Sequence, residues 1–134
     1  MLKAEGRRPH PGRILLERFR QGLELYGIVH FGLNTFTDRE WGYGDEAPAQ
    51  FALTSFDADQ MVRGCRDGGL QGLIMVCKHH DGFCLWPSAT TCHTIAHASF
   101  QGGRGDLVRE VAESCRKFGL RFGVYVSPWD RNSA

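Results

Sequence analysis

Residues 72–86 read GLIMVCKHHDGFCLW, and this stretch decides the fold. Leu73 to Cys77 form an unbroken apolar run that is long enough for a strand and too short for an independent helix. A strand without alternation between apolar and polar residues is covered on both faces, as in the parallel sheets of α/β proteins. Ionisable and aromatic side chains follow at once, from Lys78 to Trp86. Because α/β folds place ligands at the carboxyl ends of parallel strands, we expect a binding site directly after this strand.

The same plan repeats on either side of this stretch. Residues 26–31 (YGIVHF) are β-branched and aromatic, which predicts a first strand, and residues 121–127 (RFGVYVS) predict a third. Between the strands, apolar residues recur at helical spacing in residues 58–65 and 107–118, and each run follows an aspartate that can cap a helix. The order strand, helix, strand, helix, strand predicts a parallel sheet with right-handed crossovers.

Three strands and two helices do not make a closed α/β domain. The two edges of the predicted sheet would stay open, and two helices would cover it only in part. We therefore interpret residues 1–25 as a lead-in segment, with a short helix starting near residue 14. Residues 26–134 are interpreted as about three βα units of a larger βα barrel or doubly wound sheet.

The composition is that of an ordinary globular chain, and it argues against several function classes. The net charge is +1 over 134 residues, so nothing favours binding to nucleic acid or to an anionic membrane. No apolar run approaches the ~20 residues that span a bilayer. No apolar segment follows the basic N-terminus, as it would in a secretory signal. The five cysteines include no CxxC motif, which argues against a disulfide framework or a zinc site.

Each predicted strand ends in side chains that can hydrogen-bond a hydroxylated ligand, and the long connection of residues 33–51 adds a carboxylate and an indole. The candidate ligand-binding residues are His30, His79, His80, Tyr125, Glu40 and Trp41. Histidines and carboxylates donate to or accept from ring hydroxyls. An indole face packs against the apolar C–H face of a sugar. These residue types favour a carbohydrate pocket over a phosphate or nucleotide site.

Metal binding is a first alternative for the histidines. His79 and His80 with His30 could ligate a metal ion, since strand ends of barrels host such sites. However, adjacent residues in a regular strand point to opposite faces, and no carboxylate lies at a recognised ligand spacing. We therefore expect no metal. The other histidines, at positions 10, 93 and 97, are interpreted as solvated loop residues, and Lys78 as an ion-pair partner below the site.

Two further alternatives depend on glycines and cysteines. The run from Gly102 to Gly105 precedes a helix and could cradle a phosphate, but it lacks the Lys-Ser/Thr of a phosphate loop, so a simple turn is favoured. Cys77 or Cys84 could act as a nucleophile beside a histidine. The first is expected to be buried and the second has aromatic instead of cationic neighbours, which disfavours a reactive thiolate.

The chain also carries three longer motifs: FGLNTFTDREWG at residues 31–42, KHHDGFCLWPS at residues 78–88 and GVYVSPWDRN at residues 123–132. Together they resemble the N-terminal part of an α-L-fucosidase of glycoside hydrolase family 29. The sequences NTFTDREWG and SPWDRN resemble those of the family branch that acts on α-1,3/1,4-linked fucose. The resemblance covers residues 26–132, which is nearly all of the informative chain.

This resemblance implies a fold, a reaction and a substrate. The fold is a (β/α)8 TIM barrel followed by a β-sandwich, in which residues 26–134 supply the first three strands and two helices. The reaction is hydrolysis of terminal α-L-fucose from fucosylated glycans, with retention through a covalent fucosyl-enzyme intermediate and without a metal or other cofactor. Residue by residue, the family positions that contact fucose fall on His30, His79, His80, Tyr125, Glu40 and Trp41.

The chain departs from the family pattern in a few places. Phe31 stands where many members have tryptophan, and Val126 where many have a second tyrosine. The loop of residues 91–105 is longer than in other family members and lacks the tyrosine-rich sequence that commonly follows the second motif. These departures indicate variation between branches. Trp129 and Asp130 belong to the third motif, but the resemblance assigns them no fixed contact with the ligand.

The resemblance places neither catalytic carboxylate in this chain. In the family, the nucleophilic aspartate follows the fourth strand and the acid/base carboxylate comes later, so both are expected beyond Ala134. A retaining glycosidase needs two carboxyl groups about 5–5.5 Å apart. We therefore expect the isolated chain to be inactive, with open barrel edges that favour self-association. The alternatives are a non-catalytic carbohydrate-binding fragment or pseudoenzyme, and a metal-dependent barrel hydrolase.

Overall fold

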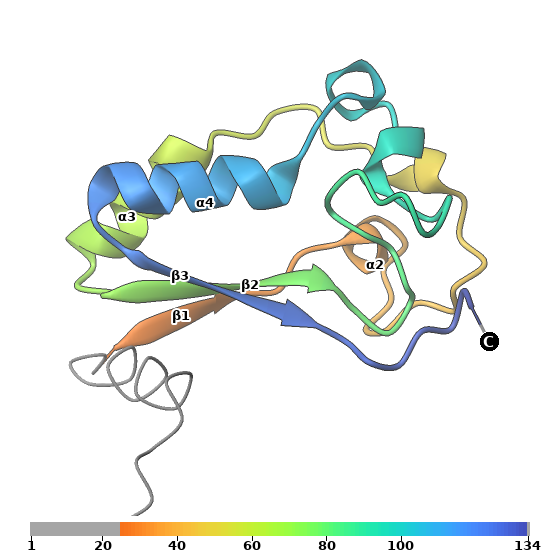
Figure 1. The fold of residues 1–134 in the computed structure, drawn as a ribbon, viewed down its shortest axis with the longest axis horizontal. Coiled ribbons are helices and arrows are strands. Elements are labelled where there is room, and N and C mark those ends of the chain that lie inside the picture. Colours follow the sequence, from red (N-terminus) through yellow and green to blue (C-terminus); the bar gives the residue numbers. More distant parts are fainter. Residues whose placement is uncertain (1–24, 134) are drawn as a thin grey trace, which may run out of the picture.

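Three parallel strands form the centre of the computed structural model, which describes residues 25–133 (Figure 1). The strands are β1 (Tyr26–Val29), β2 (Gly72–Lys78) and β3 (Arg121–Val126), with β2 in the middle. The predicted parallel α/β order is confirmed. The first strand ends two residues earlier than predicted and the third one residue earlier. The helix expected near residue 14 lies outside the described residues.

Two helices, which run opposite to the strands, cover one face of this sheet (Figure 1). Helix α3 (Ala58–Asp67) begins after Asp57, whose side chain accepts a hydrogen bond from the backbone N–H of Gln60. Helix α4 (Leu107–Phe118) begins in the same way after Asp106. A carboxylate at this position satisfies a free N–H of the first turn and complements the helix dipole. Both predicted helices are therefore confirmed.

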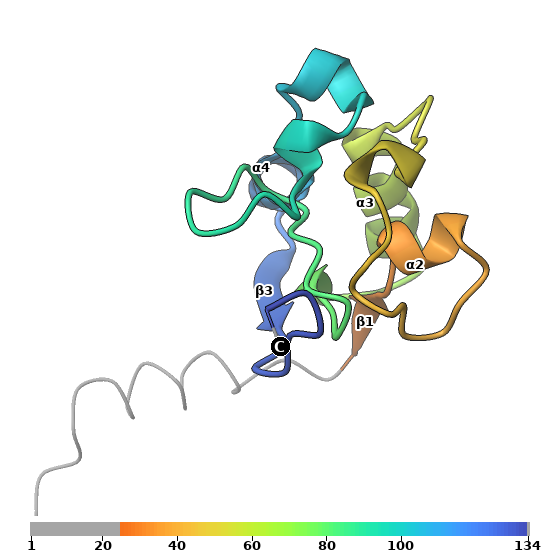
Figure 2. The ribbon, with the colours of Figure 1, turned by 90° about the vertical axis from the view of Figure 1, so that its right-hand side faces the viewer.

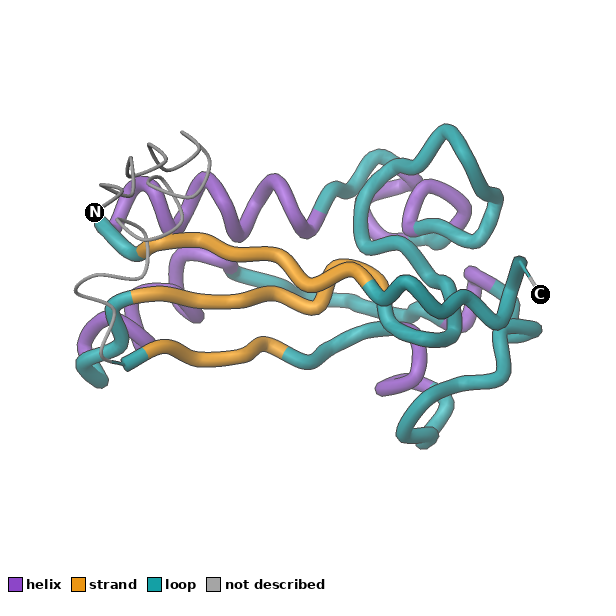
Figure 3. Tube along the Cα trace, turned by 60° about the horizontal axis from the view of Figure 1, so that its bottom comes forward, coloured by secondary structure: helices purple, strands orange, loops and turns teal. Residues whose placement is uncertain are grey.

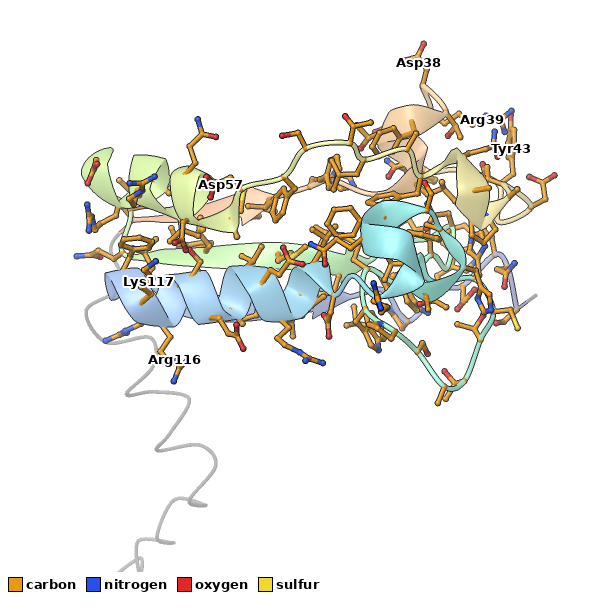
Figure 4. All side chains as sticks on the ribbon, turned by 90° about the horizontal axis from the view of Figure 1, so that it is seen from above. Asp38, Arg39, Tyr43, Asp57, Arg116 and Lys117 are labelled. Carbon is orange, nitrogen blue, oxygen red and sulfur yellow. The ribbon has the colours of Figure 1, made fainter. Side chains whose placement is uncertain are left out.

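The core lies between these helices and the sheet. Strand β2 contributes Leu73 and Met75, and the helices contribute apolar residues at helical spacing, of which Val62, Val111 and Cys115 are fully buried. On the outer side, the Lys117 ammonium of α4 pairs with the Asp59 carboxylate of α3; Figure 4 labels Lys117. Burial of apolar side chains is the main stabilising contribution here.

The opposite face of the sheet is open within the part of the chain that is described (Figure 3). Tyr26 and Ile28 of β1 are 49% and 65% exposed, whereas the intervening Gly27 and Val29 are turned toward the helices and partly buried. The described residues bury β2 fully on the helix side, whereas on the other face Ile74 is half-buried and Val76 is 7% exposed.

The carboxyl ends of the strands lead into a cluster of short helical turns (Figure 2). These are α2 (Leu33–Phe36), η1 (Pro48–Gln50), η2 (Ile95–His97) and η3 (Phe100–Gly103), of which the last two lie in the loop of residues 91–105. Phe51 packs at their centre against several aromatic rings. Across residues 25–133, every helix is too short or too polar to cross a membrane.

Candidate functional site

The histidine pair lies immediately after β2, which ends at Lys78. The ring centroids of His79 and His80 are 4.2 Å apart. The prediction that these adjacent side chains point to opposite faces was wrong. That alternation holds only inside a regular strand, and the pairing of β2 with β3 already becomes irregular between Val76 and Lys78. The two imidazoles can therefore contact one ligand together.

His30 and Tyr125 join this pair from the two neighbouring strands. His30 follows β1, and its ring centroid lies 4.5 Å from that of His79. Tyr125 lies near the end of β3, with its ring centroid 6.5 Å from that of His79. Because β1, β2 and β3 are parallel, their carboxyl ends meet at one edge of the sheet. The sheet thus brings together four of the six predicted ligand-binding residues.

Two tryptophans flank His80. The ring centroid of His80 lies 5.4 Å from that of Trp41 and 5.3 Å from that of Trp129, and the two indoles are 6.3 Å apart. The tryptophans are 43% and 51% exposed, respectively. Indole faces next to an imidazole offer apolar and hydrogen-bonding surface side by side. This combination suits a ligand that has hydroxyl groups on one side and C–H groups on another.

Arg131 connects the loops that carry these aromatic rings. Its guanidinium carbon lies 5.1 Å from the ring centroid of Trp129 and 5.6 Å from that of Trp41. Its Nη1 donates to the carbonyl oxygen of Gly42 at 2.7 Å, and its backbone N–H donates to the carbonyl oxygen of His80 at 2.9 Å. One residue therefore links the segment after β3 to the Trp41 loop and to the segment after β2.

An ion pair supports the same segment. The Nζ of Lys78 donates to Oδ2 of Asp130 at 2.7 Å, and both side chains are mostly buried. Burial acts to raise the pKa of the Asp130 carboxyl, but Lys78 and the backbone N–H groups of Asn132 and Ser133 outweigh it and hold the pKa below its usual value. The prediction that Lys78 forms an ion pair is confirmed.

His79 is a neutral group in this site. Burial lowers the pKa of its imidazole, His30 and His80 lower it further, and Glu40 opposes them. The Nδ1 atom is buried and has no hydrogen-bond partner among the described residues. A neutral imidazole offers one donor and one acceptor nitrogen. His79 is therefore suited to hydrogen bonding with an uncharged ligand at neutral pH.

The carboxylates near the rings differ in their surroundings. Glu40 is exposed, and its backbone carbonyl oxygen accepts a hydrogen bond from Nδ2 of Asn34 at 2.9 Å. Asp81 is only 2% exposed; burial raises the pKa of its carboxyl, and its Oδ1 accepts from the N–H of Phe83 at 2.9 Å. Asp81 thus stabilises the turn after the histidines, whereas Glu40 is free to meet a ligand.

Glu46 and Arg39 stabilise the long first loop at the outer corner of the site. Both carboxylate oxygens of Glu46 accept backbone N–H bonds, from Tyr43 at 2.7 Å and from Gly44 at 2.8 Å. Burial acts to raise the pKa of Glu46, but these bonds and Arg39 lower it. The Arg39 guanidinium carbon also lies 3.9 Å from the Tyr43 ring centroid, and both residues are labelled at this corner in Figure 4. The loop is therefore held by its own side chains.

Sequence reasoning misplaced His93 and did not single out Ser127 or Arg131. His93 was predicted to be solvated, but it is 4% exposed, its ring packs edge-on against Phe83, and burial lowers its pKa. His97 is exposed, as predicted. Ser127 was not singled out, yet its Oγ lies 2.7 Å from Nδ1 of His80. Its position in the third motif, directly after the strand, was the available signal.

The other chemistries weighed from the sequence receive little support from the described residues. Across residues 25–133, no group of three or more His, Cys, Asp or Glu side chains is arranged to hold a metal. Burial raises the pKa of Cys77 to about 11 and also raises that of Cys84, so both thiols stay protonated at neutral pH. The N-terminus of α4 is capped by the Asp106 carboxylate, which disfavours a phosphate there.

A family model and a curated relative both match this chain to the same family. The profile of the family described as alpha-L-fucosidase matches residues 18–134. Alpha-L-fucosidase 1 of Arabidopsis thaliana is 42% identical over 130 residues, which cover 93% of this chain and 26% of that protein. This chain therefore spans about a quarter of the length of that relative.

Comparison with solved structures gives the same family and fold. A glycoside hydrolase family 29 member from an unknown rumen bacterium matches with a TM-score of 0.82 and 45% identity, covering 92% of this chain and 22% of that one. A Ruminococcus gnavus family 29 fucosidase in complex with fucose matches with a TM-score of 0.74 and 39% identity, covering 85% and 24%. The three-stranded α/β arrangement is thus shared with fucosidase structures.

Proposed function

The chain belongs to the α-L-fucosidase family of glycoside hydrolases, and on that premise we propose that it supplies the fucose-binding wall of an enzyme that removes terminal α-L-fucose from glycans. The observation that carries this proposal is the cluster of imidazole and indole rings at the carboxyl ends of three parallel strands. In this proposal the parent enzyme is a longer protein that contains this chain together with the remainder of a fucosidase.

The proposed architecture of the parent enzyme is a (β/α)8 barrel that contains β1 to β3. In such a barrel the helices lie outside, and the inner faces of the strands pack against the other strands. The exposed apolar side chains Tyr26 and Ile28 support this arrangement, because they alternate along β1 with Val29, which packs against the core. The ring cluster would then lie at the carboxyl-terminal mouth, where barrels of this type bind their substrates.

Each predicted residue has a proposed task in fucose binding. His30, His79 and His80 would hydrogen-bond the sugar hydroxyls, and Tyr125 would add a phenolic donor from the third strand. Glu40 would accept from a hydroxyl, and Trp41 would cover a C–H face of the ring. The proposal that these residues contact one sugar together is supported by distances of 4.2 to 6.5 Å between neighbouring ring centroids among the histidines, Trp41 and Tyr125.

The catalytic carboxylates are proposed to come from the part of the parent enzyme that follows Ala134. Retention needs a nucleophile and an acid/base group about 5–5.5 Å apart. The buried carboxylates near the rings are already engaged: Asp81 accepts from a backbone N–H, Asp130 pairs with Lys78, and Glu46 accepts two backbone N–H bonds. These engagements support the proposal that this segment binds the sugar and that residues outside it carry out the catalysis.

Kinetics of the parent enzyme on an aryl α-L-fucoside test this proposal. His80→Ala should lower kcat/KM at least tenfold, because a hydrogen bond to the sugar in the transition state is lost. The matched control is His97→Ala, since His97 is exposed on η2 away from the ring cluster, and it should leave kcat/KM unchanged. Equal effects of the two variants would remove His80 from the site. An inactive wild-type parent enzyme would overturn the fucosidase function.

The isolated chain provides a second test. Without the two carboxylates it should bind L-fucose weakly or not at all, and it should not hydrolyse an aryl α-L-fucoside. Measurable turnover by the purified 134-residue chain, abolished by substituting one of its own carboxylates, would contradict the proposal. Fucose binding by calorimetry together with an inactive parent enzyme would instead favour the non-catalytic carbohydrate-binding function.

A further inference from the structure

Ser127 is the only described residue that hydrogen-bonds the side chain of His80, and it does so from a fully enclosed position. It follows β3 directly, is 1% exposed, and donates its backbone N–H to the carbonyl oxygen of Lys78 at 2.9 Å. Its Oγ lies 2.7 Å from Nδ1 of His80, 2.8 Å from the carbonyl oxygen of Trp129 and 3.1 Å from the backbone nitrogen of Trp129. The hydroxyl therefore has three neighbours and one proton.

The direction of each of these bonds follows from counting protons. A carbonyl oxygen can only accept, so the hydroxyl proton of Ser127 is used on Trp129 O. The backbone N–H of Trp129 can only donate, so Oγ accepts there. The remaining lone pair of Oγ faces Nδ1 of His80 and can only accept as well. Nδ1 must therefore carry a hydrogen.

We infer that Ser127 is a positioning residue that holds His80 as the Nδ1–H tautomer and thereby makes its Nε2 a hydrogen-bond acceptor for a sugar hydroxyl. In a neutral imidazole only one nitrogen is protonated, so Nε2 keeps its lone pair. The described residues place no hydrogen-bond partner on Nε2, and the ring contacts both Trp41 and Trp129. The inference rests on the proposed function for the identity of the ligand.

His79 provides a contrast within the same site. Its Nδ1 is buried and has no partner among residues 25–133, so nothing described there selects one tautomer over the other. The two adjacent imidazoles thus differ in what they offer a ligand. His79 can present a donor or an acceptor, whereas His80 presents an acceptor only. Of the two, His80 is the one that demands a hydroxyl proton from the sugar.

This difference has a consequence for ligand selectivity. A sugar hydroxyl that donates to Nε2 of His80 cannot be replaced by fluorine, which carries no proton. One monofluorinated fucose among the 2-, 3- and 4-deoxyfluoro derivatives should therefore bind the parent enzyme about tenfold more weakly than L-fucose, as expected for loss of a neutral hydrogen bond. An Nε2–H donor would instead tolerate the fluorine at that position as a weak acceptor.

Nitrogen NMR of the imidazoles tests the tautomer without any sugar. The 134-residue chain and the parent enzyme are labelled with ¹⁵N-histidine, and the His80 signals are assigned with His80→Gln. At a pH where the ring is neutral, Nδ1 of His80 should have the shift of a protonated nitrogen and Nε2 that of an unprotonated one. A protonated Nε2, or an averaged pair of shifts in the wild-type parent enzyme, overturns the inference even if every Ser127 variant fails to fold.

Binding of the fluorinated sugars to Ser127 variants of the parent enzyme gives the second test. One of the monofluorinated fucoses is expected to bind the wild type about tenfold more weakly than L-fucose. Ser127→Ala should reduce this difference in affinity to about twofold or less, because the tautomer of His80 is no longer fixed. Ser127→Thr retains the hydroxyl and should restore the discrimination. Unchanged discrimination in Ser127→Ala would contradict the role of Ser127. Failure of the wild type to bind L-fucose would refute the proposed function, while the NMR result would still decide the tautomer.

Discussion

Gly82 makes a sharp test of how the site is held, because its position combines a backbone constraint with a close contact. Its φ is +82°, a left-handed conformation that costs an L-residue with a side chain about 1–2 kcal/mol. A Cβ at Gly82 would also lie 2.2 Å from Oδ1 of Asp130, far inside contact distance. Gly82→Ala must therefore displace Asp130, the partner of Lys78.

The expected magnitude follows from these two contributions. Losing the charge-assisted hydrogen bond between Lys78 and Asp130 costs about 1.5–3 kcal/mol, so with the strain Gly82→Ala should lower the free energy of unfolding by about 2.5–5 kcal/mol. Gly69→Ala is the matched control: its φ is +90°, but a Cβ there meets nothing within 4 Å. It should cost only the strain, about 1–2 kcal/mol.

Urea unfolding of the 134-residue chain, followed by tryptophan fluorescence, measures both variants. An Asp130→Ala background removes the obstructing carboxylate, so there Gly82→Ala should cost markedly less than in the wild type, with the 3.0 Å approach to Cβ of Asn132 as the remaining close contact. In the parent enzyme, Gly82→Ala should also lower kcat/KM, because Trp129 and Arg131 flank Asp130 in the loop that it displaces. Equal costs for the two glycine variants, or an unchanged cost in the Asp130→Ala background, would refute the reasoning.

Three further predictions address the aromatic wall, the buried histidines and the open sheet face. Arg131→Met should raise KM for an aryl α-L-fucoside about tenfold in the parent enzyme, because it removes a charge-assisted hydrogen bond to Gly42 and two cation–π contacts. Arg116→Met, on the outer side of α4 (Figure 4), is the control and should leave KM unchanged. Equal KM values in the two variants would count against a role of Arg131 in holding the indoles. Burial lowers the pKa of His93 below its ordinary 6.5, so the unfolded chain binds the proton more tightly and the free energy of unfolding should fall as pH drops through 6.5. His93→Gln should make this fall smaller in urea unfolding measured at a series of pH values. The same dependence of the unfolding free energy on pH in His93→Gln and wild type would contradict the assignment to His93. Ile28→Lys should reduce self-association of the chain in analytical ultracentrifugation, because Ile28 is 65% exposed on the open face. The control Gln60→Lys adds the same charge at an exposed position of α3 and should leave the sedimentation coefficient unchanged. A similar decrease in both variants would show that the added charge, and not the open face, changes the association.

Local sequence patterns were sufficient to predict the regular elements. The apolar run of residues 73–77, the helical spacing after Asp57 and the cap at Asp106 each depend on neighbours within a few residues, and each element was found close to where it was predicted. The boundaries were less well predicted. Strand β1 stops at Val29 because the chain then turns into α2, and the residues YGIVHF themselves carry no sign of that turn.

The side-chain surroundings at the site could not be predicted in the same way. His93 looked like a solvated loop residue, since its sequence neighbours are polar, but the fold packs it against Phe83. The adjacency of His79 and His80 suggested opposite directions, and the end of the strand put their rings 4.2 Å apart. The two errors have different causes: tertiary packing buries His93 against Phe83, whereas the irregular end of β2 sets the direction of the His79 and His80 rings.

The sequence by itself determined the element order, the parallel sheet and the family, because periodicity, capping residues and long motifs are encoded in consecutive positions. Only the tertiary structure decided which atoms meet at the strand ends: Ser127 on Nδ1 of His80, Asp130 on Lys78 and Arg131 over two indoles. The contacts of Ser127 with His80, of Asp130 with Lys78 and of Arg131 with Trp41 join residues that are 47 to 90 positions apart in the chain. Hydrogen-bond direction and ring contact act over a few ångströms, and only the folded sheet brings such segments that close.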